Sequence, residues 1–478
     1  MKIISKLLKF LPLILVLLAF QACSDDDDGG TPVDPALLNI VEIASANPNL
    51  SSLVAALGAA DGDLVNLLSS GTFTVLAPDN DAFQALLDSN DAWDTIDDID
   101  SAVLAQVLLN HVINGSVTSA DLTAQGSGYT KTNADGVASQ KLSLYYDTSN
   151  GVTFNGTSTV ATGGADISAS NGTIHIIDAV IALPSIVDLV AANTNNLSLL
   201  TSSLVDEDLD DVLAGDGPFT VFAPTDAAFT GFSNDNGNAL SEILLNHVLI
   251  GTSAISTGLD TGYVTTGATF DDGDTDDDNN VNLSLFINTD GGVNLNGVST
   301  VTTADIIGTN GVVHVVNGVI DLPTIVTHAQ ANPGLSALVA SLLEADGSDA
   351  NPMLVPTLSG DGPFTVFAPL DTAFTALLAT DATWNSPADI PDALLNSVLT
   401  HHVIVGANAR AEGLTDGMMP ETLEGDLITI NLPGNDDNAA KITDGSGNED
   451  IDIVLTNVQC ANGVVHAVES VLIPDTTN

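Results

Sequence analysis

The apolar positions along the chain follow a pattern that occurs three times. Each copy opens with an apolar stretch at helical spacing that begins at Ile40, Ile186 or Ile325, and an Asn stands seven residues after each Ile. A second apolar stretch at helical spacing follows each Asn. Apolar residues that recur every three or four positions predict amphipathic helices, so two helices are expected at the start of each copy.

A nearly continuous apolar run comes next in each copy, at 74–78, 220–224 and 365–369. Each run ends at a proline, which cannot continue a central strand because it has no N–H to donate. The runs therefore predict buried strands that end at Pro78, Pro224 and Pro369. In the second and third copies an Asp then stands three residues before a Phe, as Asp226 and Asp371. We expect this Asp to cap the helix whose first turn the Phe docks onto the core.

Each copy closes with an Asn-Gly pair between strand-like segments, at Asn171, Asn310 and Asn462. Asn-Gly is the strongest short signal for a hairpin turn, so a closing hairpin is predicted. The apolar runs that follow end at Pro184, Pro323 and Pro474. The predicted units are 36–184, 185–323 and 324–475, with almost no linker between them, which favours a semi-rigid rod.

Six of the eight histidines occupy two repeat-equivalent positions. The central set is His111, His247 and His402, and the hairpin set is His175, His314 and His466. Each lies among aliphatic residues, where an imidazole can bridge buried backbone groups with its donor and acceptor nitrogens. A metal site in every unit is the alternative, but no Cys, His or Glu stands beside them at ligand spacing. We interpret both sets as structural. His328 replaces the residue equivalent to Ile43 and Leu189, and is expected to pack within its helix.

These blocks resemble the fasciclin (FAS1) domain family. Residues 74–83, 220–229 and 365–374 are similar to the family's first motif, the Asn-Gly-x-x-His blocks to its second, and the central His-Val pairs lie between them. All three signatures recur in order three times and cover nearly the whole chain after the amino-terminal segment. The resemblance implies the α+β class, with each unit a twisted β-sandwich or wedge with helices packed along its edge. It also implies roles in adhesion and the extracellular matrix.

Two departures limit what the resemblance carries. Asn110, Asn246 and His401 stand where animal members often have a Tyr linked to integrin recognition, so integrin binding is not expected here. The third copy has Asn457 where the others have Asp166 and Asp305.

The charge balance is strongly acidic, with 62 Asp and Glu against 7 Lys and Arg, a formal net charge of −55. Nucleic-acid binding is excluded because phosphate contacts need Lys and Arg. An anionic membrane surface should repel the chain, whereas cations and a salty medium suit it. Hydrophobic residues make up 44% and charged residues 14%, so a folded interior with an acidic surface is expected.

The amino terminus is expected to direct export. Residues 1–22 have a basic start and an apolar run, which are typical of a signal peptide rather than of a membrane span. Cys23 resembles the lipid-modified cysteine of bacterial lipoproteins. Residues 23–35 form an acidic tether, ~40 Å long if 24–35 are extended. A Ser-Asp-Asp run directly after the Cys is similar to the surface-export signal of lipoproteins in the Bacteroidetes group. We therefore expect an anchor at Cys23 in the outer membrane, facing outward.

The densest acidic run is 271–280, where Asp272, Asp274, Asp276 and Asp278 alternate with other residues. Such carboxylates can supply oxygen ligands to Ca²⁺. The run lacks the Gly at position 6 and the Glu at position 12 of an EF-hand loop. We interpret it as a solvated hairpin loop that attracts cations diffusely and keep Ca²⁺ binding as the alternative; no other cofactor is expected.

Catalytic motifs are absent from the sequence: there is no Gly-x-Ser-x-Gly, no Lys-bearing phosphate loop and no His-Glu-x-x-His. Cys460 is expected to be a small buried residue. We therefore predict a surface lipoprotein without enzymatic activity that binds extracellular polysaccharide, matrix or the surface proteins of other cells through weak, multivalent contacts. The alternative is a binding module for a small apolar ligand or a polysaccharide.

Overall fold

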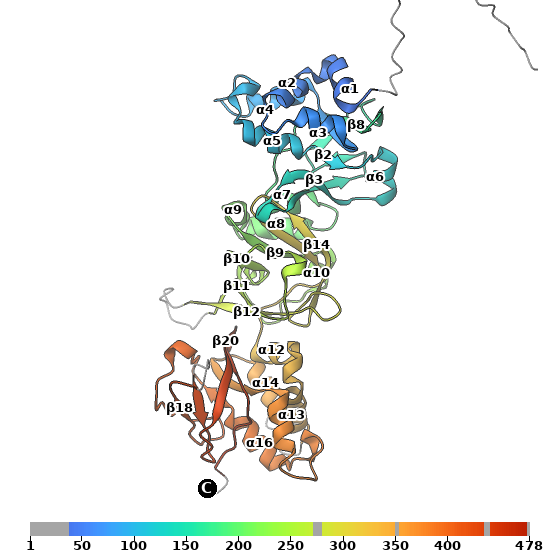
Figure 1. The fold of residues 1–478 in the computed structure, drawn as a ribbon. Coiled ribbons are helices and arrows are strands. Elements are labelled where there is room, and N and C mark those ends of the chain that lie inside the picture. The colour runs from blue at the N-terminus through green and yellow to red at the C-terminus, as the bar shows by residue number, and fades with distance from the viewer. Residues whose placement is uncertain (1–37, 271–279, 349–352, 435–439, 476–478) are drawn as a thin grey trace, which may run out of the picture.

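The computed structural model describes residues 38–270, 280–348, 353–434 and 440–475 of the 478-residue chain. These residues form three units stacked end to end, coloured from blue to red in Figure 1. We call the segments that contain α1–β8, α7–β15 and α12–β21 unit 1, unit 2 and unit 3. Each unit has one curled sheet with helices packed against it. The predicted α+β class and the three tandem units are confirmed.

Unit 1 combines six α-helices with eight strands among its described residues. The helices are α1 (Ile40–Ala46), α2 (Ser51–Ala59), α3 (Leu64–Ser70), α4 (Asn80–Asp88), α5 (Ser101–Leu109) and α6 (Ser119–Gln125). The strands are β1 (Phe73–Pro78), β2 (Val112–Asn114), β3 (Gly128–Asp135), β4 (Lys141–Asp147), β5 (Thr153–Phe154), β6 (Ser158–Thr159), β7 (Ile167–Ala169) and β8 (Gly172–Ile177).

Units 2 and 3 follow a similar order of elements, with a 3-10 helix in place of α6, and the second half of unit 3 contains two strands of only three residues. The helices of unit 2 are α7 (Ile186–Ala192), α8 (Ser198–Asp206), α9 (Asp210–Ala214), α10 (Asp226–Gly231) and α11 (Leu240–Leu245). Its strands are β9 (Phe219–Pro224), β10 (Val248–Ile250), β11 (Gly262–Phe270), β12 (Val281–Asn288), β13 (Asn294–Leu295), β14 (Ser299–Ile307) and β15 (Gly311–Val316). The helices of unit 3 are α12 (Ile325–Ala331), α13 (Ser336–Gly347), α14 (Leu354–Ser359), α15 (Asp371–Leu378) and α16 (Asp392–His401). Its strands are β16 (Phe364–Pro369), β17 (Val403–Val405), β18 (Thr429–Asn431), β19 (Lys441–Thr443), β20 (Ile451–Cys460) and β21 (Gly463–Val468).

Each sheet is built around a parallel pair of strands. In unit 1 the order is β6-β5-β4-β3-β2-β1-β8-β7, and β1 runs parallel to β8 from Phe73↔Gly172 to Pro78↔Ile177. The corresponding parallel pairs are β9 with β15 and β16 with β21. The strand before each Asn-Gly pair is antiparallel to the strand after it, so the three closing hairpins are confirmed.

The central strand β1 is buried along its whole length because both faces of the sheet are covered. Phe73 and Val75 belong to the core between the sheet and the helices. Leu76 points to a second core on the other face, which it shares with Leu144 and Phe154. Units 2 and 3 have the same two cores, which explains why the predicted strand shows a continuous apolar run instead of alternation.

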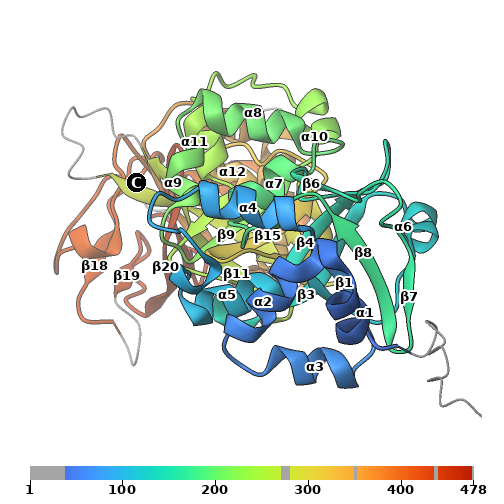
Figure 2. The ribbon, with the colours of Figure 1, turned by 90° about the horizontal axis from the view of Figure 1, so that it is seen from above.

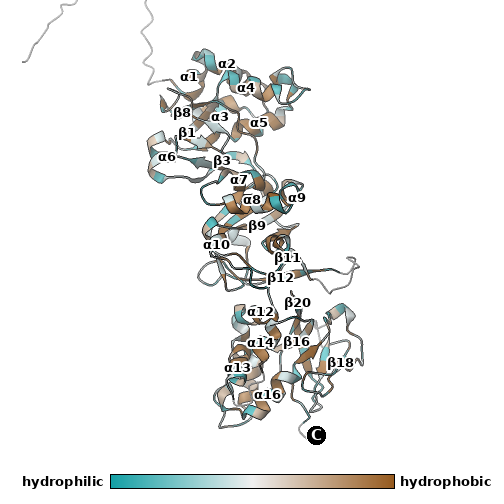
Figure 3. Cartoon of the chain, turned by 180° about the vertical axis from the view of Figure 1, so that it is seen from behind, coloured by the Kyte–Doolittle hydropathy of each residue, from teal (hydrophilic) through white to brown (hydrophobic). Residues whose placement is uncertain are grey.

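Apolar residues, brown in Figure 3, run along the helices and strands of all three units. Among the described residues, no single helix has both the length and the apolar composition of a membrane span. Only the strongly bent pair Pro48–Ala59 and Leu64–Ser70 passes such a test when its two arms are counted together.

The expectation that Asp226 caps the helix it begins is wrong. The amino-terminal cap of α10 is Thr225, whose hydroxyl accepts from the Ala228 amide. The Asp226 carboxylate instead accepts from the Leu199 amide at 2.8 Å, in the first turn of α8, a helix that has no side-chain cap of its own. Asp371 does the same for α13, accepting from the Ala337 amide at 2.8 Å. The Asp therefore satisfies an exposed helix end that lies next to it in space but far from it in the sequence.

The Asn of each closing turn has a second task that turn formation alone does not require. The Asn171 side chain accepts from the Ile40 amide at 2.9 Å and donates to the carbonyls of Leu68 and Gly71. Asn310 and Asn462 make the equivalent bonds in units 2 and 3. One side chain thus joins the start of the first helix, the end of the third and the closing hairpin in every unit.

The two junctions between units use the same contacts. In the first, Ser143 Oγ on β4 accepts from the Ile307 amide on β14 at 2.9 Å. In the second, Ser284 Oγ on β12 accepts from the Gln459 amide on β20 at 3.0 Å. The first junction also holds Lys131, which donates to the Asp305 carbonyl at 2.5 Å.

His328 on α12 is buried at the second junction, 1% exposed, with its ring edge-on to Tyr263 at 5.3 Å between centroids. Neither ring nitrogen has a hydrogen-bond partner. Burial lowers the pKa of His328 to about 4, and the nearby backbones of Ser284 and Gln459 act in the opposite direction. The equivalent residue at the first junction, Leu189, is fully buried and needs no polar partner.

We therefore expect His328→Leu to stabilise unit 3 against unfolding by roughly 1–3 kcal/mol, because it removes two unpaired buried nitrogens. The unfolded imidazole takes up a proton near the ordinary histidine pKa of 6.5 and the folded one only near 4, so wild-type stability falls as the pH drops between these values. The gain should therefore be larger at about pH 5 than at about pH 7.5. Calorimetric unfolding of both proteins at the two pH values measures this, and a lower melting temperature for the variant at both would contradict it.

Candidate functional site

The central histidines lie at the carboxyl ends of α5, α11 and α16, directly before β2, β10 and β17. There each ring bridges two backbone groups. His111 Nδ1 lies 2.7 Å from the Val107 carbonyl, and the Ile181 amide donates to Nε2 at 2.9 Å. His247 and His402 have the same two partners, with equal distances, in the other units. Each ring thus ties the end of α5, α11 or α16 to the segment before the closing proline.

These contacts fix the protonation state of the ring. Because Nε2 accepts an amide proton, the neutral ring must carry its own proton on Nδ1, which donates to the helix carbonyl. No lone pair is left for a metal ion. Burial lowers the pKa of His111, His247 and His402 to about 4, so the neutral form prevails near neutral pH.

The hairpin histidines use the opposite tautomer. The Asp166 amide donates to His175 Nδ1 at 3.3 Å, and His175 Nε2 lies 3.0 Å from the Val117 carbonyl, to which it donates. His314 and His466 repeat both contacts. The pKa values of His314 and His466 are lowered, chiefly by burial. These rings also have both nitrogens engaged with backbone groups.

A threonine from the central strand completes this network. The Val117 amide donates to Thr74 Oγ1 at 2.8 Å, and that hydroxyl donates to the Gly115 carbonyl. Thr220 and Thr365 make the equivalent pairs of bonds. In each unit the loop after the second strand is therefore held by His through a carbonyl and by Thr through an amide.

The departure at Asn457 is matched by a second change in unit 3. In units 1 and 2 an aspartate accepts from the amide and hydroxyl of one serine: Asp166 from Ser119 and Asp305 from Ser256. In unit 3 Asn457 accepts from the Ala411 amide and donates its own N–H to Glu412. The three residues have φ of 56°, 62° and 61°, a left-handed conformation that Asp and Asn tolerate.

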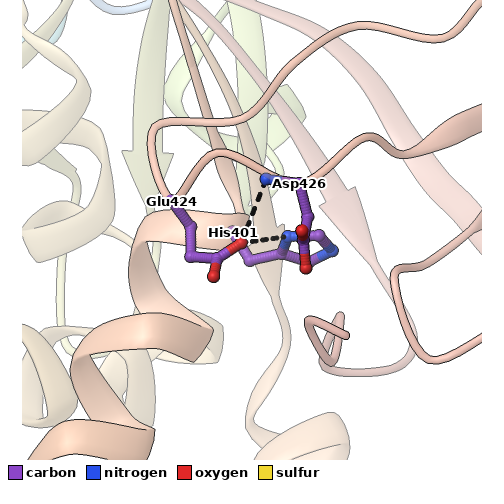
Figure 4. A group of neighbouring side chains, drawn as sticks. All are labelled: His401, Glu424 and Asp426. Atoms are coloured by element: carbon purple, nitrogen blue, oxygen red, sulfur yellow. Dashed lines mark hydrogen bonds and ion pairs between the residues drawn. The ribbon is translucent and has the colours of Figure 1, made fainter. Parts of the chain in front are cut away.

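One group among the described residues has the composition of a metal site: His401, Glu424 and Asp426, shown in Figure 4. We call it the His401 cluster. Potential ligand atoms of all three lie within 4.8 Å of one another, His401 is buried and the carboxylates are half-buried. His401 ends α16, and the two acids lie in the tight turn before β18. Asn110 and Asn246 occupy the His401 position in the other units.

The hydrogen bonds of the His401 cluster compete with metal binding. The Gly445 amide donates to His401 Nε2 at 3.2 Å, so the neutral ring carries its proton on Nδ1, which faces Glu424 Oε2 at 3.5 Å and the Thr422 hydroxyl at 3.3 Å. A cation that binds Nδ1 would have to displace this proton. The ring would then carry no proton on either nitrogen, unless the hydrogen bond from Gly445 breaks and Nε2 is protonated instead. Burial lowers the pKa of His401, and the charges of Glu424, Asp426 and Asp444 partly oppose this.

The same contacts explain the His401 cluster as a tie between segments. Glu424 accepts from the Ser397 hydroxyl on α16, and Asp426 accepts from the Asp475 amide near the end of the described chain. The group was missed in the sequence because its members are distant along the chain, and with 62 acidic residues no spacing singles out Glu424 or Asp426.

Several predicted site residues lie outside the described residues. These are Cys23 and the Ca²⁺ candidates Asp272, Asp274, Asp276 and Asp278. Their roles stay predictions. Cys460 is fully buried, and burial raises the pKa of its thiol.

The surface cavities of the described residues include three that are large enough for a ligand. One of about 550 Å³ lies between units 1 and 2, beside Asp147 and Asp188, and one of about 380 Å³ lies between units 2 and 3, beside Asn238 and Asp361. The third, about 320 Å³, is an apolar groove of unit 3. Its lining includes Leu377, Trp384, Leu394, Val398 and Ile473.

The fasciclin domain family matches residues 48–184, 195–323 and 341–474. The chain is 30% identical to human periostin over 284 residues, which is 55% of this chain and 29% of periostin. It is 38% identical to protein sll1483 of Synechocystis sp. over 151 residues, which is 32% of this chain and 73% of that protein. A solved pair of FAS1 domains from the insect cell adhesion molecule fasciclin I aligns with a TM-score of 0.36 and 18% identity, covering 57% of this chain and 97% of that structure.

If the central histidines are structural, His247→Leu should destabilise unit 2 by roughly 2–5 kcal/mol, because the Ile243 carbonyl and the Ile320 amide lose their buried partner. His328→Leu is the matched control: it is the same substitution at a buried His, with the opposite sign expected because that ring has no partners. Denaturant unfolding measures both, with and without EDTA. If EDTA lowers wild-type stability to that of His247→Leu, the ring binds a metal instead.

For the His401 cluster we expect that Zn²⁺ titrated into the protein gives no one-to-one binding that depends on His401. His401→Asn introduces the residue of units 1 and 2 and should cost only about 1–2 kcal/mol, for the lost contacts with Glu424 and Gly445. His402→Asn, one residue later, should cost more because it breaks the central bridge. Calorimetric titration decides the question, since a single Zn²⁺ site that disappears in His401→Asn would establish a metal centre.

Proposed function

The chain belongs to the fasciclin domain family, and from this membership we propose that it is an adhesion protein of the cell surface that acts through three units in a row. Adhesion and matrix binding are what the family resemblance implies. The partners we propose are extracellular polysaccharide, matrix and the surface proteins of other cells, bound by many weak contacts rather than by one deep site.

One observation carries the proposal: the polar side chains that recur in every unit form hydrogen bonds to backbone groups inside the fold. The central and hairpin histidines have both ring nitrogens in contact with backbone groups, and the repeated Thr and Asn side chains are bonded to backbone as well. Catalysis by general acid or base needs such a group within reach of a substrate. We therefore propose that the protein is not an enzyme and that its outer surface is what partners meet.

The acidic surface favours interactions with partners that are bridged by cations. With few Lys and Arg to offset 62 carboxylates, direct contact with an acidic polysaccharide would be repulsive. Divalent cations between the two surfaces would remove that repulsion. Adhesion should therefore depend on Ca²⁺ or Mg²⁺ even though no specific site is required.

We propose that residues 1–22 are removed, that Cys23 carries a lipid and that residues 23–35 hold the three units away from the outer membrane. The proposed boundaries between units lie after Pro184 and Pro323. The sequence features at the amino terminus support this location, and the acidic tether would not pack against the units.

The apolar groove beside Trp384 favours one alternative, the binding of a small apolar ligand. Its volume of about 320 Å³ lies at the lower end of ligand pockets in proteins. Material that absorbs light or is detected by mass after solvent extraction of the purified protein would support this alternative.

The adhesion proposal is tested by deleting the gene and restoring it either as wild type or as Cys23→Ser. Deletion should reduce attachment and biofilm, more strongly when Ca²⁺ is present, and wild type should restore both. Cys23→Ser should not restore them, because the protein is then released or left unprocessed. Attachment that is the same in the deletion strain with and without Ca²⁺, at equal growth, would reject the proposal.

A further inference from the structure

Both junctions pair the same two surfaces. We call the outward side of the β3–β4 or β11–β12 hairpin the exit face, and the surface made by the first helix and the strand before the closing turn of the next unit the entry face. At the first junction Tyr129 and Ser143 of the exit face contact Leu189 and Ile307 of the entry face: Tyr129 Oη donates to the Leu189 carbonyl at 2.8 Å. At the second junction, Tyr263 contacts His328 on α12 and the Asn332 that follows it, and Ser284 contacts Gln459 on β20.

Unit 3 also has an exit face, and no other unit of the described residues packs against it. The exit hairpin of unit 3 can be aligned with that of unit 2 from shared contacts. Thr422 contacts His401 in unit 3 as Thr266 contacts Asn246 in unit 2, so Thr422 corresponds to Thr266 in the first strand of the hairpin. The second strand of the hairpin is aligned by its pairing with the first. Glu421 pairs with Leu427, and the Ile430 amide donates to the Met418 carbonyl. Met419 then takes the place of Tyr263, and Leu427 that of Ser284.

The exit face of unit 3 is exposed and carries apolar side chains beside the exposed Glu421, which pairs with Leu427. Met419 is 56% and Leu427 47% exposed, whereas Ser284 is only 8% exposed beneath unit 3. Leu423, in the turn between them, is 41% exposed. Figure 2 shows β18 and β19 clear of units 1 and 2. Three neighbouring exposed apolar side chains on one hairpin of so acidic a protein mark an interaction surface.

Unit 1 has the complementary entry face, and no other unit of the described residues packs against it. Ile43 occupies the position of Leu189 and His328, which are at most 1% exposed at the junctions, yet Ile43 is only half-buried. Ser168 occupies the position of Ile307 and is exposed, while Ile307 is 1% exposed. The two ends of the chain therefore present the two halves of a contact that the molecule already makes twice.

We propose that the exit face of unit 3 docks on the entry face of unit 1 of a second copy, so that chains associate head to tail. The contact is continuous with the two internal junctions and is heterologous, so it adds further copies without closing into a symmetric dimer. The proposal does not depend on what the protein adheres to.

Two physical terms set the strength of this contact. Inside the chain, the direct linkage of the units gives each junction an effective concentration of about millimolar or more, which separate chains lack. Between chains, the like charges also repel, so association should be weak at low salt and should strengthen as salt screens the repulsion. Leu427 in place of Ser removes the hydrogen bond to the entry strand, at the position of Ser168, and Met419 in place of Tyr brings an apolar side chain opposite Ile43.

The test uses the purified protein in sedimentation velocity runs at concentrations up to about 1 mM, in low and in high salt. The wild type should show a mass that rises above the monomer with concentration, and more so in high salt. The exit variant Met419→Asp/Leu427→Asp and the entry variant Ile43→Asp should each remain monomeric. Val212→Asp, at a residue 54% exposed on α9 and away from both faces, is the control and should behave as wild type.

Mixing the two variants gives a positive result that a misfolded protein could not. Each variant keeps one intact face, so an equimolar mixture should form dimers and stop there, whereas the wild type continues to larger assemblies. A monomeric wild type at the highest concentration and salt, variants that associate as the wild type does, or a mixture without dimers would each overturn the proposal.

Discussion

The fold depends on one kind of interaction, a buried polar side chain that satisfies backbone groups from segments far apart in the sequence. The central imidazole is its clearest form. His111, His247 and His402 each close the carboxyl end of a helix against an amide before the final proline, in a core that is otherwise aliphatic. An unpaired amide or carbonyl there would cost about as much as one such bond provides, so the unit needs both nitrogens of the ring. A histidine used in this way is unavailable for chemistry, and this links the architecture to a binding role.

Much of this architecture could be predicted from the sequence because it is local and occurs three times. The apolar run before Pro78, the Asn-Gly turns and the helical spacing after Ile40 each depend on residues that are neighbours along the chain. The interactions that could not be predicted join distant segments. Asp226 caps α8 rather than α10, and Asn171 joins the first helix, the third helix and the hairpin, because the fold brings helix ends to side chains that no spacing rule connects. The His401 cluster was missed for the same reason.

The junctions show how a chain with almost no positive charge holds three acidic units together. Ion pairs cannot do it, and the contacts observed are hydrogen bonds to backbone, hydrogen bonds from Asn to Tyr side chains, and aromatic or apolar packing. Lys131 is the exception: its ammonium is placed against the Asp305 carbonyl and the Ser143 hydroxyl, and burial lowers its pKa to about 8. At the second junction Thr265 stands in its place and His328 stands where the first junction has Leu189. The second junction is therefore the less well-satisfied of the two, since it buries a ring without partners where the first buries an aliphatic side chain.

Unit 3 departs from the other two units both at its exit hairpin and beside its junction with unit 2. In units 1 and 2 the exit hairpin contacts the next unit, with a small Ser where the entry strand approaches and long strands such as β11 and β12, whose pairing shifts register between Thr265 and Thr269. Unit 3 has a shorter hairpin with Leu427 at that place, and its turn holds Glu424 and Asp426 against His401. Its Asp-Ser pair is likewise replaced by Asn457 and Glu412, with the single arginine of the chain, Arg410, bonded to Glu412 and Gln459. Gln459 also donates its amide to Ser284 at the junction with unit 2, so this group lies on the entry side of unit 3. On the exit hairpin, Met419, Leu423 and Leu427 are exposed beside Glu421. In a molecule with so much surplus negative charge, exposed Met and Leu at that end are hard to explain by solubility, and a partner that covers them accounts for them directly.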